Sequence, residues 1–168
     1  MFTRAVRAAR FDKKAFTEAY FNDDAAADGA IIVASVGTIS YLGILLWHVG
    51  LDAFNLGRLL QTVLAGVMSW LILAIATWFV ATRLFGARGR PQTMMGLQGL
   101  AVLPLLLEMA RNQVVAGIGL IWYLALLVMA TREAGDLSPR NAGVAVLVGF
   151  ALAVLVRALF SVPFAVFG

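Results

Sequence analysis

The sequence contains no cysteine and few charged residues, and both features limit what the protein can do. Without cysteine, the chain has no disulfide, no thiolate nucleophile and no cysteine ligand for a metal ion. Charged residues make up only 13% of the 168 residues, whereas soluble domains carry about 25%. Because 62% of the residues are hydrophobic, a soluble domain of this size could not bury its apolar surface, and lipid must cover it.

Acids and histidine are also scarce, which argues against catalysis. The chain has nine acidic residues and one histidine, His48. Eight of the acids lie in the N-terminal segment or in loops, so paired carboxylates cannot face each other within the membrane. No serine has a histidine or lysine near it at membrane depth, as a serine hydrolase would require. We therefore expect a protein that is not an enzyme and that holds neither a cofactor nor a metal ion.

Long apolar runs predict an all-α polytopic membrane bundle of five transmembrane helices. About 20 apolar residues suffice for a helix to cross a hydrocarbon layer about 30 Å thick. Two such runs lie between Met94 and Glu133 with only residues 110–113 between them, which predicts a membrane hairpin. Pro104 interrupts the first run, and we expect it to kink that helix. The remaining spans are expected at about 29–49, 59–85 and 141–164.

Residues 1–28 differ in composition from the rest and form a polar leader ahead of the transmembrane domain, residues 29–168. At 100° per residue, aromatic and apolar side chains gather on one side of the leader and basic side chains on the other. This pattern predicts one amphipathic helix lying on a membrane surface. The alternative is that the helix packs on the loops of the bundle. The candidate lipid-surface residues are Phe2, Arg4, Arg7, Arg10, Lys14 and Phe16.

The distribution of basic residues predicts the orientation in the membrane. With the N-terminus in the cytoplasm, ten lysines and arginines fall on the inner side and two, Arg58 and Arg111, on the outer side. The positive-inside rule then places the N-terminus in the cytoplasm and the C-terminus outside, in the inner (cytoplasmic) cell membrane. The net charge of +4 and the pI near 10.1 reflect these loops. We therefore expect contact with anionic lipid and not with nucleic acid.

Several short motifs follow the same order as in a known family. The chain has a short amphipathic leader, five spans, and the motifs Gly99-Leu100-Ala101, Pro104, Ile121-Trp122 and Thr131-Arg132-Glu133. In this it resembles the bacterial branch of the Yip family, the Ypt-interacting proteins. The resemblance implies five helices and a cytoplasmic N-terminus. Eukaryotic members look like trafficking factors that contact small GTPases of the Rab type; because the leader here is shorter than their cytoplasmic regions, we do not expect a small GTPase as partner.

Glu108 and Arg157 are two oppositely charged residues that the expected spans place at similar depth in the membrane. A charge in hydrocarbon costs about 2.5–3.5 kcal/mol on insertion scales, so such residues usually find a partner, a water-filled cavity or headgroups. One hypothesis is an ion pair that ties the fifth span to the hairpin, and the alternative is that each side chain reaches the interface separately, with Arg111 satisfying Glu108. A proton or substrate role is a third reading. Reversing the charge of Arg157 should lower the yield, and reversing both charges should restore it.

Two functions fit this sequence. Small residues recur at four-residue spacing, as in Ala30, Ala34 and Thr38, which indicates close helix approach inside the bundle or against another protein. We therefore expect an accessory, scaffold or membrane-organising subunit that contacts the lipid bilayer and binds another membrane protein or a second copy. The alternative is a transporter or channel component for a small solute. Its polar path would have to come from scattered residues such as Ser35, Thr62, Thr77 and Gln98.

Overall fold

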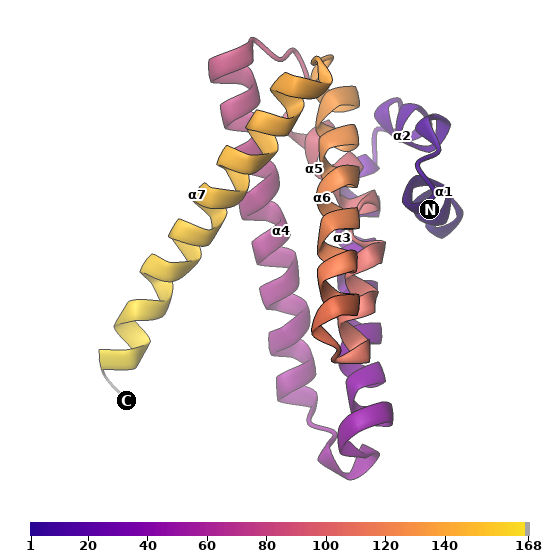
Figure 1. Cartoon of the computed structure of the whole chain (residues 1–168), viewed down its shortest axis with the longest axis vertical. Helices are drawn as coiled ribbons and strands as arrows, with labels where there is room; N and C mark the ends of the chain where they lie inside the picture. The colour runs from indigo at the N-terminus through magenta and orange to yellow at the C-terminus, as the bar shows by residue number, and fades with distance from the viewer. Residues whose placement is uncertain (167–168) are drawn as a thin grey trace.

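The structure is a computed structural model that describes the backbone of residues 1–166 and the side chains of residues 1–155; every element in this part of the chain is helical (Figure 1). Three helices are long and apolar enough to cross a membrane. They are α3 (Ala25–Ile44) with its π-helical continuation η1 (Leu45–Val49), α4 (Leu56–Phe85) and α6 (Gln113–Gly135).

Two further helices, α5 (Pro91–Leu100) and the 3-10 helix η3 (Leu103–Ala110), meet at a bend of 41° and together are long and apolar enough for a broken span or a re-entrant loop. The last helix, α7 (Pro139–Val166), has 28 residues, and Pro139–Leu155, the part whose side chains are described, is a shorter apolar helix. The prediction of an all-α polytopic membrane bundle is therefore confirmed.

The expected hairpin of residues 94–133 is present, with a bend close to Pro104. Proline has no N–H to donate to the preceding turn, and the chain continues in the tighter 3-10 geometry, with the N–H of Leu105 donating to the carbonyl of Val102 at 3.0 Å. The hairpin then turns at Arg111, whose φ is +47°. Asn112 begins α6 because its side-chain oxygen accepts from the N–H groups of Val114 and Val115 at 2.9 and 3.3 Å.

Helix α5 lies at the centre of the packing, in contact with α3, α4 and α6. Its C-terminal half is almost wholly buried, and α3 crosses it with backbone against backbone. A Cβ atom on Gly99 would clash with the Cα of Gly29 and would lie 2.9 Å from its carbonyl carbon. One on Gly96 would meet Ala25. Only glycine permits this approach, so these residues fix the distance between α3 and α5.

The leader differs from the single helix that the sequence predicts. It forms two short helices, α1 (Phe2–Ala9) and α2 (Lys13–Tyr20), which turn at Phe11, where φ is +61°. Asp12 ends the turn because its carboxylate accepts from the N–H of Lys14 at 2.9 Å and caps α2. The prediction of one continuous helix is therefore wrong, because a capping residue in mid-segment favours a new helix start over continuation.

Candidate functional site

The corner between α1 and α2 is held by charged side chains at its exposed surface. The Nε of Arg7 donates to the Asp12 carboxylate at 2.7 Å, and its Nη1 donates to both oxygens of Glu18 at 3.0 Å. The hydrogen bond from Arg7, and then the one from the Lys14 N–H, holds the pKa of Asp12 below its usual value. The same pairing raises the pKa of the Arg7 guanidinium. Arg7 therefore makes ion pairs within the leader.

Lowering the pH should weaken the ion pairs that hold the corner between α1 and α2. A carboxylate whose pKa is lowered in the folded state contributes stability above its usual pKa of 3.8 and loses that contribution as the pH falls through the lowered value. Because the native chain lacks cysteine, Thr3→Cys and Thr17→Cys allow two spin labels to report the α1–α2 distance. We expect a narrow distance distribution at pH 6 that broadens below about pH 4.

Asp12→Asn is the matched control for this acid effect. Asparagine caps a helix as well as aspartate does, so the variant keeps the start of α2 while losing the charge that pairs with Arg7. We expect its distance distribution to be broader at pH 6 and to change less on acidification. An identical acid response in both proteins would show that the Arg7–Asp12 pair does not hold the corner.

The leader packs on the hairpin through small residues and one tryptophan. Ala5, Ala8 and Phe16 are fully buried, so α1 and α2 lie directly against the bundle (Figure 1). The indole Nε1 of Trp122, in the middle of α6, donates to the carbonyl of Ala9 at 2.9 Å. The ring of Trp122 also stacks on Phe11, with centroids 6.5 Å apart and planes inclined by 12°. Much of the leader therefore packs on the bundle, which is the alternative that the sequence left open.

A second link joins the leader to the start of α3. Arg4 lies 3.6 Å from the carboxylate of Asp28, which also accepts from the side-chain amide of Asn22 at 3.0 Å. Both side chains of the ion pair are partly exposed, so its contribution is modest. The main effect of this ion pair is to orient α1 across the first turn of α3.

The predicted lipid-surface residues do not share one surface. Phe16 is fully buried, which corrects its placement on a membrane-facing side. The reason is that α2 turns away from α1, so the two helices do not continue one amphipathic face. Phe2 is 50% exposed and Val6 47%, on the side of α1 that the bundle leaves open. Arg10 and Lys14 are exposed as well.

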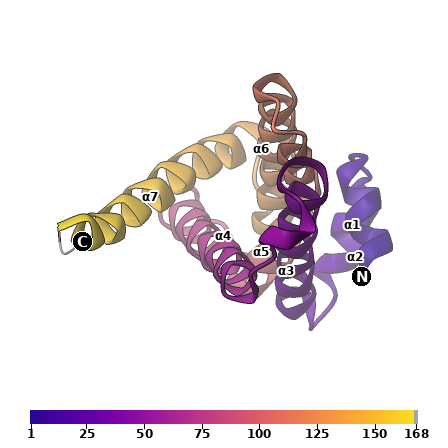
Figure 2. The same ribbon diagram turned by 90° about the horizontal axis from the view of Figure 1, so that it is seen from below.

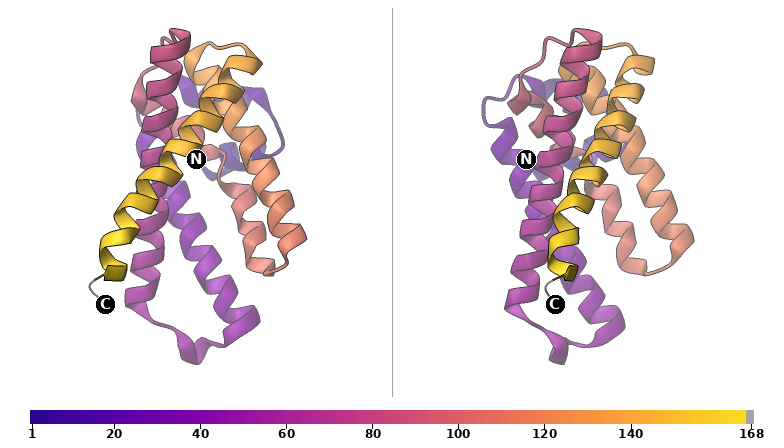
Figure 3. Two further views of the ribbon diagram at one scale, coloured as in Figure 1. Left: turned by 60° about the vertical axis from the view of Figure 1, so that its left-hand side comes forward. Right: turned by 90° about the vertical axis from the view of Figure 1, so that its left-hand side faces the viewer.

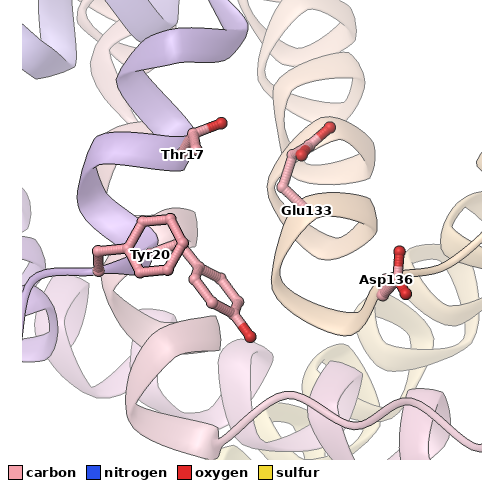
Figure 4. A pocket seen from close by; sticks show the side chains of 5 residues that line it. Thr17, Tyr20, Glu133 and Asp136 are labelled. Atoms are coloured by element: carbon pink, nitrogen blue, oxygen red, sulfur yellow. The ribbon is translucent and has the colours of Figure 1, made fainter.

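Two open cavities flank the junction of α2 with the bundle. The smaller, about 260 Å³, lies between α2 and the C-terminal end of α6; Thr17 and Tyr20 face Glu133 and Asp136 across it (Figure 4). The larger, about 540 Å³, shares Tyr20 and Phe21 with the first and extends towards the start of α5, where Arg88 and Arg90 line it. Neither cavity follows from sequence periodicity, because each combines elements far apart in the chain.

Comparison with known families now assigns the chain. The family model of the Yip1 domain matches residues 17–161, which includes the second half of α2, all of α3 to α6 and most of α7. The chain belongs to the Yip1 domain family. No curated protein matches the sequence at a significant level. No solved structure does so either. Yip1-domain proteins are generally non-enzymatic membrane proteins, and this chain is a multi-pass member. Helix α1, with Phe11 and Asp12, precedes the match.

In this Yip1-domain protein several hydroxyls of the apolar helices bond within their own helix, whereas the buried hydroxyl of Thr77 has no partner among the described residues. The hydroxyls of Ser35, Thr38 and Thr62 donate to carbonyls one turn earlier at 2.7, 2.9 and 2.8 Å. Gln98 and Thr131 are fully buried, and the amide of Gln98 donates to the hydroxyl of Thr131 at 3.2 Å. That bond crosses from α5 to α6. It was missed because no local pattern marks two residues on different helices as partners.

At the opposite end of the bundle, His48 forms a hydrogen bond with the hairpin. Its Nε2 lies 3.0 Å from the carbonyl of Met109 and joins η1 to η3. Among the described residues, no three metal-binding side chains converge. Glu108 and Arg111 are exposed, and no ion pair joins them within the described side chains. The side chain of Arg157 lies outside the described residues, so the Glu108–Arg157 pair stays a prediction.

Proposed function

We propose that this Yip1-domain protein is a non-enzymatic accessory or membrane-organising subunit, which binds a transmembrane helix of another membrane protein or of a second copy. The proposal assigns residues 29–168 to partner binding and the leader, residues 1–28, to the cytoplasmic surface. The observation that carries it is the course of α7.

Helix α7 begins inside the bundle and then leaves it. Ala142, Ala145 and Gly149 are buried, and Gly149 lies so close to α4 that an added Cβ would be 2.9 Å from the Cα of Thr77. Further along, the exposed fractions are 38% at Leu152 and 55% at Leu155. In three directions of view α7 diverges from α6 and η3 (Figures 1, 2 and 3).

The exposed positions near residue 155 lie on one side of α7, opposite the side that packs on the bundle through Gly149, Phe150 and Ala153. Ala151, Leu152, Val154 and Leu155 are all exposed, and successive positions on an α-helix are 100° apart. No other helix of the described chain covers this exposed side, so it is open to a partner helix as well as to lipid. Apolar side chains of this kind pack against a partner helix by van der Waals contact.

The arrangement also supports the proposed orientation. The turns between α4 and α5 and between α6 and α7 lie at one end of the bundle, and the α3–α4 connection lies at the other (Figure 1). Arg88, Arg90 and Arg140 belong to the first end, and Arg58 belongs to the second. The positive-inside rule then favours a cytoplasmic location for the first end, in an inner membrane.

The test is site-specific photocrosslinking in native membranes, followed by native mass measurement after gentle extraction. A photoreactive phenylalanine analogue replaces Leu152 or Leu155, and the control replaces Ile121, which is 71% exposed on α6. We expect discrete protein adducts from the two α7 positions and chiefly lipid adducts from the control, together with a mass above that of one chain. Lipid adducts at all three positions and a monomer mass would contradict partner binding.

A further inference from the structure

The larger of the two cavities, about 540 Å³, is lined by two arginines, by polar residues, and by Tyr20, Phe21 and Ala25. It lies where the α4–α5 loop meets the end of α2 and the start of α3. Arg88 and Arg90 come from the loop, Gln92 and Thr93 from the first turn of α5, and Asn22 with Asp23 from the α2–α3 connection. Its volume is within the range of about 300–1,000 Å³ that small-molecule sites occupy.

The loop that carries the two arginines is held in place by the glycine between them. The indole Nε1 of Trp78 donates to the carbonyl of Gly89 at 2.9 Å. On the other side, a Cβ on Gly89 would clash with the carbonyl oxygen of Ala134 and would lie 2.9 Å from its carbonyl carbon. Gly89 therefore packs between α4 and the end of α6.

Fixing Gly89 also sets the direction of its neighbours. Arg90 has extended backbone angles, φ −78° and ψ 149°. In extended chain, side chains two residues apart point to the same side, opposite to that of the residue between them. With Gly89 packed inward, Arg88 and Arg90 both face the cavity, as its lining shows. The packing of Gly89 thus fixes the backbone of the loop from which the exposed side chains of Arg88 and Arg90 line the cavity.

The electrostatics of the cavity favour an anion with more than one charge. Neither Arg88 nor Arg90 forms an ion pair within the described side chains. Asp23 also lines the cavity, with Asp24 beside it in the chain, so the cavity offsets part of its own positive charge. The first turn of α5 has no side-chain cap, and Gln92 and Thr93 of that turn line the cavity. Amide N–H groups at such a helix start are suited to phosphate oxygens.

We propose that this cavity binds a phosphate monoester, with Arg88 and Arg90 as its cationic ligands. A dianionic phosphate gains from both arginines and tolerates the single carboxylate in the lining, whereas a zwitterionic headgroup gains little. The aromatic pair on the rim favours a lipid as the source, because Phe21 is 79% exposed and lies edge-on to Tyr20 at 5.2 Å. Exposed aromatic rings beside a basic cavity are suited to the membrane–water interface. This inference does not depend on partner binding by α7.

The experiment measures binding of the purified full chain in nanodiscs by native mass spectrometry. Nanodiscs of phosphatidylcholine alone are compared with nanodiscs containing phosphatidic acid, which carries a phosphate monoester. In a second arm, glycerol 3-phosphate is titrated into the phosphatidylcholine nanodiscs. Arg88→Gln with Arg90→Gln removes the proposed ligands, and Arg83→Gln with Arg140→Gln is the control, since both are exposed arginines of the same end that do not line the cavity.

We expect phosphatidic acid to be retained, and the Arg88/Arg90 double variant to weaken its binding by about thirtyfold, at roughly fivefold per arginine. The control double variant should stay within about threefold of the native protein. If glycerol 3-phosphate binds equally well and shows the same loss, the phosphate site holds and its source is soluble. Equal losses in the two double variants, or no binding in either arm, would overturn the proposal, and an unchanged thermal midpoint excludes misfolding as the cause.

Discussion

Replacing Gly99 by alanine should strongly destabilise the protein. The added carbon would enter the backbone of Gly29, where α3 and α5 touch, and neither backbone can move without shifting a whole helix. Overpacking of this kind costs about 1–3 kcal/mol, and backbone contact places Gly99 near the upper end. For a chain of 168 residues, the thermal midpoint in detergent should fall by roughly 4–10 °C.

Gly66→Ala is the matched control, because Gly66 is also in a helix and an added Cβ there would have no atom within 4 Å. Alanine has a higher helix propensity than glycine by about 1 kcal/mol, so this variant should be equal to the native protein or more stable. A smaller loss for Gly99→Ala than for Gly66→Ala would show that α3 and α5 are not in backbone contact. The measurement is thermal unfolding followed by size-exclusion chromatography of the soluble fraction.

The spans could be predicted because lipid imposes length and composition on them. The second span was expected at 59–85 and is observed at Leu56–Phe85, and the fifth was expected at 141–164 and is observed at Pro139–Val166. The ends follow local chemistry: Gly86 adopts a left-handed conformation after α4, and Ser138 accepts from the N–H of Asn141 at the start of α7.

Which small residues bring helices together could not be predicted from spacing. The expected stripe of Ala30, Ala34 and Thr38 is only half-buried, whereas the close contact on α3 uses Gly29 and Ala25. The rotation of a helix about its axis depends on its partners, and α3 turns Gly29 towards α5 because Gly96 and Gly99 permit backbone approach there. A four-residue repeat indicates that small residues share one face of a helix. It does not indicate whether that face contacts another helix.

The candidate sites were less predictable than the spans, since their residues come from distant parts of the chain. Periodicity places Arg7 on a basic face of the leader, and in the structure its guanidinium turns back to Asp12 and Glu18. In the sequence, Arg88 and Arg90 contribute to the predicted orientation, and the segment around them lacks the lysine and hydroxyl of a phosphate loop. Their common direction depends on the packing of Gly89 against Ala134, and a contact over that sequence distance leaves no local signal.

Trp122→Ala should release the leader from the bundle. The variant loses the hydrogen bond to the Ala9 carbonyl, worth about 0.5–1.5 kcal/mol, and the stacking on Phe11, worth a similar amount. A combined loss of about 2 kcal/mol raises the open fraction of the leader roughly thirtyfold. Trypsin cleaves after Arg7, Arg10 and Lys13 only when the leader is open, so the initial cleavage rate in detergent should rise by the same factor.

Two further variants separate the indole N–H from the ring and from general effects of losing a tryptophan. Trp122→Phe keeps an aromatic ring for Phe11 but removes the donor to Ala9, so cleavage should rise only about fivefold. Trp47→Ala removes a side chain that is 68% exposed at the other end of the bundle, and its cleavage rate should equal the native one. Native-like cleavage of Trp122→Ala would mean that Ala5, Ala8 and Phe16 hold the leader without the indole. Cleavage rates that fall in the order Trp122→Ala, Trp122→Phe and native would show that Trp122, which lies within the matched domain, anchors α1, which precedes that domain.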